Sequence, residues 1–247
     1  TSANETRASG YYMGDSINFT LSGETDSGLT ITQKIELEGG VDNQSTAIAG
    51  DFGTLTYHKH GGDSVMSGWD DMTPNAYEES WVLATVDTTT TGTNDEVVMI
   101  NGRAGNALWR YDSPTYSGVS VHASYVQAAA AAGESDHGDV NGYTDWGVQI
   151  APEMLEGLTI GYAQAEIDES ATITVDESTL WITYTTGPIS VGYQTSEADG
   201  TTSTQDDEAT LMSISYAVTD DLSISYGTAE VDLGSSTTDQ ESKGISA

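Results

Sequence analysis

The sequence contains no cysteine, and its six Lys and Arg residues face 39 Asp and Glu residues, which gives a net charge of -33. Without cysteine the chain has no disulfide, no thiolate nucleophile and no cysteine-based zinc site. So few cations disfavour binding to nucleic acid, whose phosphates an acidic chain repels rather than neutralises. The charge instead favours enrichment of cations around the molecule.

Long hydrophobic runs are also absent. No stretch of about 18 apolar residues occurs, which excludes a transmembrane helix. Two classes remain: a soluble fold, or a membrane β-barrel, whose strands carry a much weaker sequence signal. The length fits one β domain over residues 1–247.

What the sequence does contain is alternation with a period of two. In Leu158–Ala163, for example, the even positions are large and apolar and the odd positions are small or polar. Such alternation places one set of side chains on each face of a strand. It predicts an all-β chain with strands at about 16–25, 29–38, 44–50, 53–60, 103–113, 117–127, 142–151, 157–168, 177–186, 188–197, 209–218 and 221–232.

The predicted connections alternate in length. Short turns at 26–28, 51–52, 187 and 219–220 alternate with longer polar segments at 61–96, 128–141, 168–177, 198–208 and 233–244. Short turns on one rim and long loops on the other are typical of outer-membrane barrels. Tyr also recurs on the apolar face near strand ends, as expected of a lipid-facing band. Periodicity alone leaves a soluble β-sandwich equally open.

The motif Gly50-Asp51-Phe52-Gly53-Thr54-Leu55, preceded by two alternating strands and followed by a long acidic segment, resembles the general Gram-negative porins. The residues Leu108–Pro114 are similar to the strand that follows the constriction loop in that family. The chain looks most like the porins of marine α-proteobacteria. The resemblance implies an antiparallel transmembrane β-barrel of the 16-stranded type in the outer membrane, a homotrimer, and passive diffusion of small hydrophilic solutes and ions. It also implies that residues 61–96 form a constriction loop folded into the barrel.

The chain departs from the family pattern in three respects. We count about twelve strands rather than sixteen, and we therefore expect a sequence that is incomplete at both ends. The segment 39–43 is short where many porins carry the latch between subunits. Apart from Arg110, the basic positions of the wall are not filled.

Charge selectivity in a channel depends on the residues that line its narrowest part. The resemblance assigns the constriction to Asp63, Asp70, Asp71, Glu78, Glu79 and Arg110. The phase of the strands adds Lys34, Glu36, Glu38, His58, His60 and Asp112 to the lumen wall. With so few cations on the wall, we expect a pore that prefers cations.

Two histidine patterns suggest chemistry, but neither is sufficient. His58 and His60 share a predicted strand face, but a metal site needs a third ligand such as Asp63, so we expect no metal site. Ser120 and His122 point the same way from one strand at about 7 Å spacing, which we judge too far for a direct hydrogen bond. We therefore expect no enzyme and no cofactor, with at most weak Ca²⁺ binding by the acidic loops.

Two hypotheses follow from the sequence. The first is an outer-membrane porin in contact with lipid and lipopolysaccharide. The second is a soluble, secreted, acidic β-sheet protein for adhesion that binds calcium or glycans. The second accounts for the charge and the missing cysteine, but not for the ordered match over 16–80.

Overall fold

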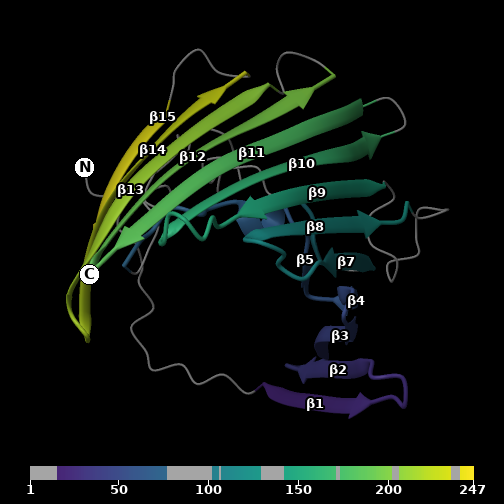
Figure 1. The fold of residues 1–247 in the computed structure, drawn as a ribbon. Coiled ribbons are helices and arrows are strands. Elements are labelled where there is room, and N and C mark those ends of the chain that lie inside the picture. Colours follow the sequence, from purple (N-terminus) through teal and green to yellow (C-terminus); the bar gives the residue numbers. More distant parts are fainter. Residues whose placement is uncertain are drawn as a thin grey trace.

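The structure is a computed structural model that describes residues 16–76, 102–105, 107–128, 142–170, 173–201, 206–234 and 240–247. Thirteen strands form one antiparallel sheet in chain order, curved into an arch with β1 and β15 at its edges (Figure 1). The strands of this sheet are β1 (Ile17–Glu24), β2 (Thr30–Leu37), β3 (Val41–Gly50), β4 (Gly53–His60), β7 (Leu108–Asp112), β8 (Val119–Val126), β9 (Tyr143–Ile150), β10 (Leu158–Ser170), β11 (Ile173–Thr186), β12 (Ile189–Gly200), β13 (Asp207–Thr219), β14 (Leu222–Leu233) and β15 (Gln240–Ser246). No helix of the described residues is long and apolar enough to cross a membrane.

The predicted all-β class is confirmed, although the predicted strand 103–113 is divided into β6 and β7. One predicted connection was wrong: residues 233–244 were expected to form a loop, but β15 begins within them. The connections 168–177 and 198–208 were also predicted too long, because β10, β11, β12 and β13 extend into them. The extensions of β10, β12 and β13 carry no large apolar residue, so their strand character comes from pairing with the neighbouring strand. The extension of β11 alternates between Ile173, Thr174, Val175 and Asp176, a strand pattern too short to stand out from the sequence.

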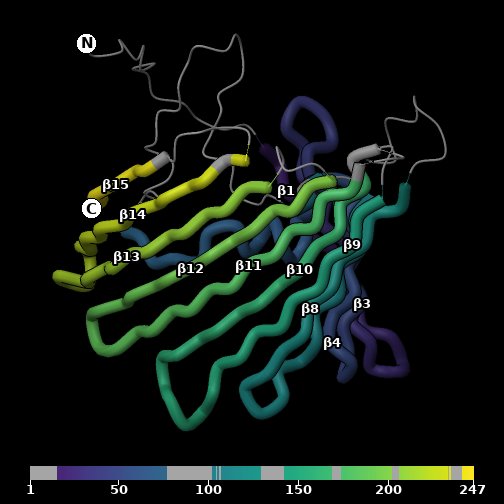
Figure 2. Tube along the Cα trace, turned by 90° about the horizontal axis from the view of Figure 1, so that it is seen from above, coloured from purple at the N-terminus to yellow at the C-terminus, as the bar shows by residue number. Residues whose placement is uncertain are grey.

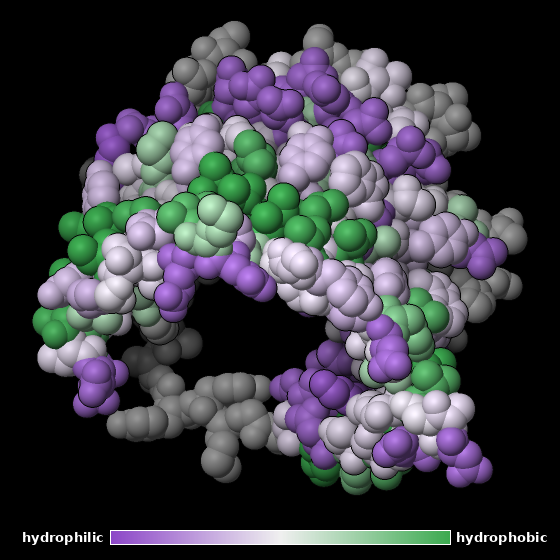
Figure 3. All heavy atoms as spheres, viewed as in Figure 1, coloured by the Kyte–Doolittle hydropathy of each residue, from purple (hydrophilic) through white to green (hydrophobic). Residues whose placement is uncertain are grey.

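The two faces of the sheet differ in chemistry. On β12, Ile189, Val191 and Tyr193 are exposed on the convex face, whereas Gln194 and Ser196 are buried on the concave face. Figure 3 shows hydrophobic residues along the convex side of the arch, around a hollow. Large apolar side chains exposed on every strand of a wide band are what a lipid-facing surface requires. The orientation predicted from the sequence is therefore the one observed.

The four predicted short turns lie along one rim of the sheet, which Figure 2 shows for the strands that follow β7. The short connections from β2 to β3 and from β10 to β11 lie along the opposite rim. The turn in the Gly50–Leu55 motif needs glycine at position 53 for two reasons. Its φ is +107°, and a Cβ there would collide with the backbone carbonyl of Asp112 on the neighbouring strand. Only glycine combines that dihedral angle with so close a backbone approach.

Candidate functional site

After β4 the chain turns back over the concave face of the sheet, and we call its described part, residues 61–76, the infolded loop. It begins with β5 (Gly62–Asp63), which pairs with β6 (Ala104–Gly105), and contains a short 3-10 helix at Ser67–Trp69. Residues 77–96 of the predicted loop 61–96 lie outside the described residues, and with them Glu78 and Glu79.

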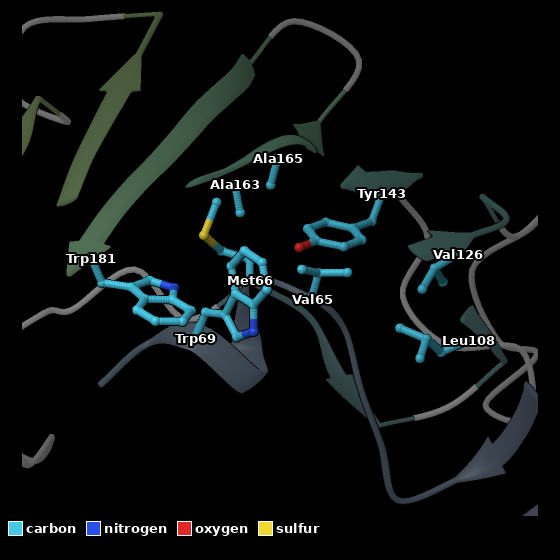
Figure 4. Packing of buried hydrophobic residues seen from close by; sticks show 9 residues of the cluster. All are labelled: Val65, Met66, Trp69, Leu108, Val126, Tyr143, Ala163, Ala165 and Trp181. Carbon is cyan, nitrogen blue, oxygen red and sulfur yellow. The ribbon is translucent and has the colours of Figure 1, made fainter. Parts of the chain in front are cut away.

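The hydrophobic core of the molecule lies between the infolded loop and the wall (Figure 4). Val65, Met66 and Trp69 are its loop members, and they are buried almost completely. The wall members come from β7 to β11: Leu108, Val126, Tyr143, Ala163, Ala165 and Trp181. Burial of a large side chain contributes roughly 1.5–3 kcal/mol, so these three loop residues fix where the loop lies.

Small wall residues make room for this packing. A Cβ added to Gly147 on β9 would lie 2.6 Å from a ring carbon of Trp69 and 2.8 Å from Val65. A Cβ on Gly192 of β12 would collide with Pro74 in the same way. Gly147 and Gly192 thus form part of the wall surface that contacts the loop.

Polar side chains of the wall bind the loop backbone at its start. Ser124 accepts a hydrogen bond from the amide of Val65 at 3.0 Å, and Asp145 accepts one from Met66 at 2.9 Å. The hydroxyl of Tyr143 donates to the same carboxylate oxygen at 2.8 Å. These groups are buried, so each hydrogen bond also avoids the cost of an unsatisfied polar atom.

Arg110 on β7 connects the loop to the wall. Its Nη1 donates to the carbonyl oxygens of Ser64 at 2.9 Å and Asp63 at 3.1 Å. Its Nε lies 3.1 Å from Oδ1 of Asp112. The guanidinium of Arg110 therefore holds the base of the loop and is paired with a carboxylate.

The same carboxylate continues into a chain of hydrogen bonds along the wall. Asp112 Oδ1 lies 2.7 Å from His122 Nδ1, and His122 Nε2 lies 3.0 Å from Ser120 Oγ. The expectation that Ser120 and His122 are too far apart was wrong. The spacing of about 7 Å applies to Cα atoms two apart on a strand, and the long imidazole side chain bridges it.

Asp70 and Asp71 lie at the turn of the loop that follows the helical residues. The backbone amide of Asp71 donates to Asp70 Oδ1, and Thr73 donates its amide and hydroxyl to Asp71 Oδ1, each at 2.9 Å. Gln194 of β12 binds the backbone of this turn. Further along, Ser225 of β14 accepts from the amide of Ala76 at 2.9 Å. The loop therefore crosses the inner wall from β8 to β14.

The remaining predicted wall residues lie near the other edge of the sheet. Lys34 and Glu36 are on β2, and Glu36 accepts a hydrogen bond from Asn18 at 3.3 Å. Glu38 is exposed in the turn after β2, and Asp63 is exposed at the base of the loop.

The prediction that His58 and His60 share one face of the strand is wrong. A register shift places His58 opposite Ser45 and His60 opposite Gln44, and consecutive residues of β3 point to opposite faces. Within the described residues, no three His, Asp or Glu side chains come together as metal ligands would.

The sequence interpretation missed the residues that hold the loop: Ser124, Asp145, Gln194, Ser213 and Ser225. Their only signal is a polar side chain at an inward position, which every strand shows. What separates them from their neighbours is the path of the loop, and that is a tertiary feature.

Comparisons with known proteins identify the family of the chain. A family model described as Gram-negative porin matches residues 1–247. Among solved structures, OmpF of Salmonella typhi in complex with daunomycin is similar at a TM-score of 0.56 and 14% identity, over 87% of this chain and 70% of that one. An anion-selective porin from Comamonas acidovorans is similar at a TM-score of 0.46 and 14% identity, over 95% of this chain and 83% of that one. No curated protein matches the chain.

Proposed function

Since the chain belongs to the Gram-negative porin family and is an outer-membrane porin, we propose that it is a passive diffusion channel for small hydrophilic solutes and that it prefers cations. The observation that carries this proposal is the infolded loop. It brings Asp70 and Asp71 onto the concave face, where polar side chains such as Gln194 hold the loop, while the exposed band of large apolar side chains faces outward. A polar lumen narrowed by a fixed loop selects by size and charge.

The sign of the preference follows from the charges that lie around the loop. Arg110 is paired with Asp112 and bound to loop carbonyls, and Arg103 lies beside the base of the loop, where its amide donates to Ser64 Oγ. The loop supplies Asp63, Asp70 and Asp71. At the ionic strength of seawater the Debye length is less than about 8 Å, so only charges next to the path of the ion influence selectivity. The field at the loop is therefore negative.

Outside the lumen, we propose contacts with lipid along the apolar band and with lipopolysaccharide beyond it. Outward carboxylates sit opposite one another across strands, as Glu166 does with Asp176, Asp176 with Asp199, and Glu197 with Glu208. Like charges in such pairs repel each other. We propose that weakly bound divalent cations reduce this repulsion. We propose a homotrimer and no resident cofactor.

The test uses the purified full-length protein in planar bilayers. We expect stepwise conductance, and under a salt gradient a zero-current potential of the sign for cation selectivity. Folded protein that gives no conductance steps contradicts the channel, and a potential of the opposite sign contradicts the cation preference alone.

A further inference from the structure

The side chain of Gln194 holds the turn that carries Asp70 and Asp71. Gln194 points inward from β12 and is fully buried at 0% exposure. Its Nε2 donates to the carbonyl oxygens of Trp69 at 2.7 Å and Asp70 at 3.2 Å, and its Oε1 accepts from the amide of Met72 at 2.7 Å. One neutral amide thus binds the backbone on both sides of the two carboxylate residues.

The orientation of this amide follows from its partners. Carbonyl oxygens accept and a backbone amide donates, so the nitrogen must face Trp69 and the oxygen must face Met72. In this orientation Nε2 also lies 2.9 Å from Thr179 Oγ1 of the wall, which accepts a hydrogen bond from it. The hydroxyl oxygens of Thr179 and Ser196 are in turn hydrogen-bonded at 2.9 Å. A loop that moved away would leave a buried amide without its partners, which is costly.

The carboxylates of Asp70 and Asp71 are fixed to the backbone of their own turn. Asp70 and Asp71 each accept a hydrogen bond from the backbone of the turn itself, so their oxygens keep their place relative to residues 69–73. The turn keeps its place relative to the wall through Gln194. Because salt screens a charge within a few ångströms, the position of these oxygens decides how strongly a passing ion feels them.

We propose that Gln194 is a specificity-determining positioning residue of the channel: without any charge of its own, it sets the cation selectivity by holding Asp70 and Asp71 at the lumen. This inference rests on the proposed function of a cation-preferring pore. It names the wall residue on which that preference depends.

The test compares two substitutions of the same kind in the full-length protein. Gln194→Met keeps length and charge but makes no hydrogen bond. Gln149→Met is the matched control, since Gln149 also points inward, from β9, but does not bind the loop. Conductance and zero-current potential are measured for both in planar bilayers. We expect Gln194→Met to lower the cation-to-anion permeability ratio about twofold or more and to raise current noise, while Gln149→Met matches the wild type.

A double-variant comparison separates positioning from a general structural effect. If Gln194 acts through the carboxylates, replacing Asp70 and Asp71 by Asn shifts the zero-current potential much less in the Gln194→Met background than in the wild type. Equal shifts in both backgrounds, or an unchanged permeability ratio in Gln194→Met, overturn the proposal. A wild type without cation preference contradicts the proposed function instead.

Folding is checked first by the heat-dependent mobility of the barrel in gels. Should Gln194→Met fail to fold, Thr179→Val takes its place. It removes the hydroxyl that holds the amide of Gln194 on the wall, and we expect a smaller shift in the same direction. An unchanged potential in folded Thr179→Val then overturns the proposal.

Discussion

The indole rings of Trp69 and Trp181 meet edge to face, with ring centroids 5.5 Å apart and planes at 87°. One ring belongs to the infolded loop and the other to β11, so this pair joins the loop to the wall through aromatic packing. On its other side Trp69 meets the ring of His122 at 5.5 Å. Trp69 is thus the loop residue that packs against the wall through two ring contacts, one with Trp181 and one with His122.

We expect Trp69→Ala to release the loop without unfolding the barrel. Loss of a buried Trp removes roughly 3 kcal/mol of packing, which here holds the loop and not the sheet. Single-channel recordings should show larger and noisier currents. Trp146→Ala is the control, because Trp146 is exposed on the outer face. Noise that rises equally in both variants would mean that Trp69 has no special hold on the loop.

Gly147→Val should push the infolded loop away from the wall. The added Cβ would lie 2.6 Å from the ring of Trp69, closer than packed atoms tolerate, so the ring must move. Overpacking of this kind costs about 1–3 kcal/mol. The expected result is a changed conductance together with shifted Trp fluorescence. Gly23→Val is the matched control, since a Cβ on Gly23 meets nothing within 4 Å.

Asp70→Asn together with Asp71→Asn tests the sign of the field. Removing two negative charges at the loop should reduce the cation-to-anion permeability ratio by about twofold or more at low salt, with less effect at high salt. The measurement is the zero-current potential across a salt gradient. Asp220→Asn with Asp221→Asn, in the turn between β13 and β14, removes the same charge far from the loop and should change little. Equal shifts would show that the field comes from the molecule as a whole.

The strands and their faces were predictable because alternation encodes them directly. In β14, Leu222, Ile224 and Tyr226 point outward in the sequence pattern and in the structure. The motif around Gly53 was predictable because its backbone requires glycine. β15, where Glu241 faces Glu230 of β14, was not predicted, because pairing rather than hydrophobic phase makes it a strand.

The site was predictable only in part, for a physical reason. Phase predicts that Arg110 and Asp112 share one face of β7, and in the structure their side chains are hydrogen-bonded to each other. Phase does not say that Arg110 binds the carbonyls of the loop, or that Gln194 holds its turn. Those contacts join residues far apart in sequence, such as Met72 and Gln194 with a separation of 122, and no local pattern reports them.

Arg110→Lys and Arg110→Met separate anchoring from charge. Lysine keeps the positive charge but lacks the fork that reaches Asp63, Ser64 and Asp112 together. If anchoring dominates, both variants raise current noise. If charge matters as well, only Arg110→Met increases the cation preference. Recordings in which Arg110→Lys is indistinguishable from wild type would show that the guanidinium contacts to the loop contribute little.

The hydrogen-bonded chain from Ser120 through His122 to Asp112 has the connectivity of a hydrolase triad, so its role needs a direct test. Asp112 also pairs with Arg110, and Ser120 lies within β8, where strand pairing occupies the backbone. We therefore expect the chain to brace the wall and not to act as a nucleophile. A fluorophosphonate probe should leave Ser120 unlabelled in the folded protein, and Ser120→Ala should leave the conductance unchanged. Covalent labelling of Ser120 that disappears in His122→Ala would contradict a channel without catalysis.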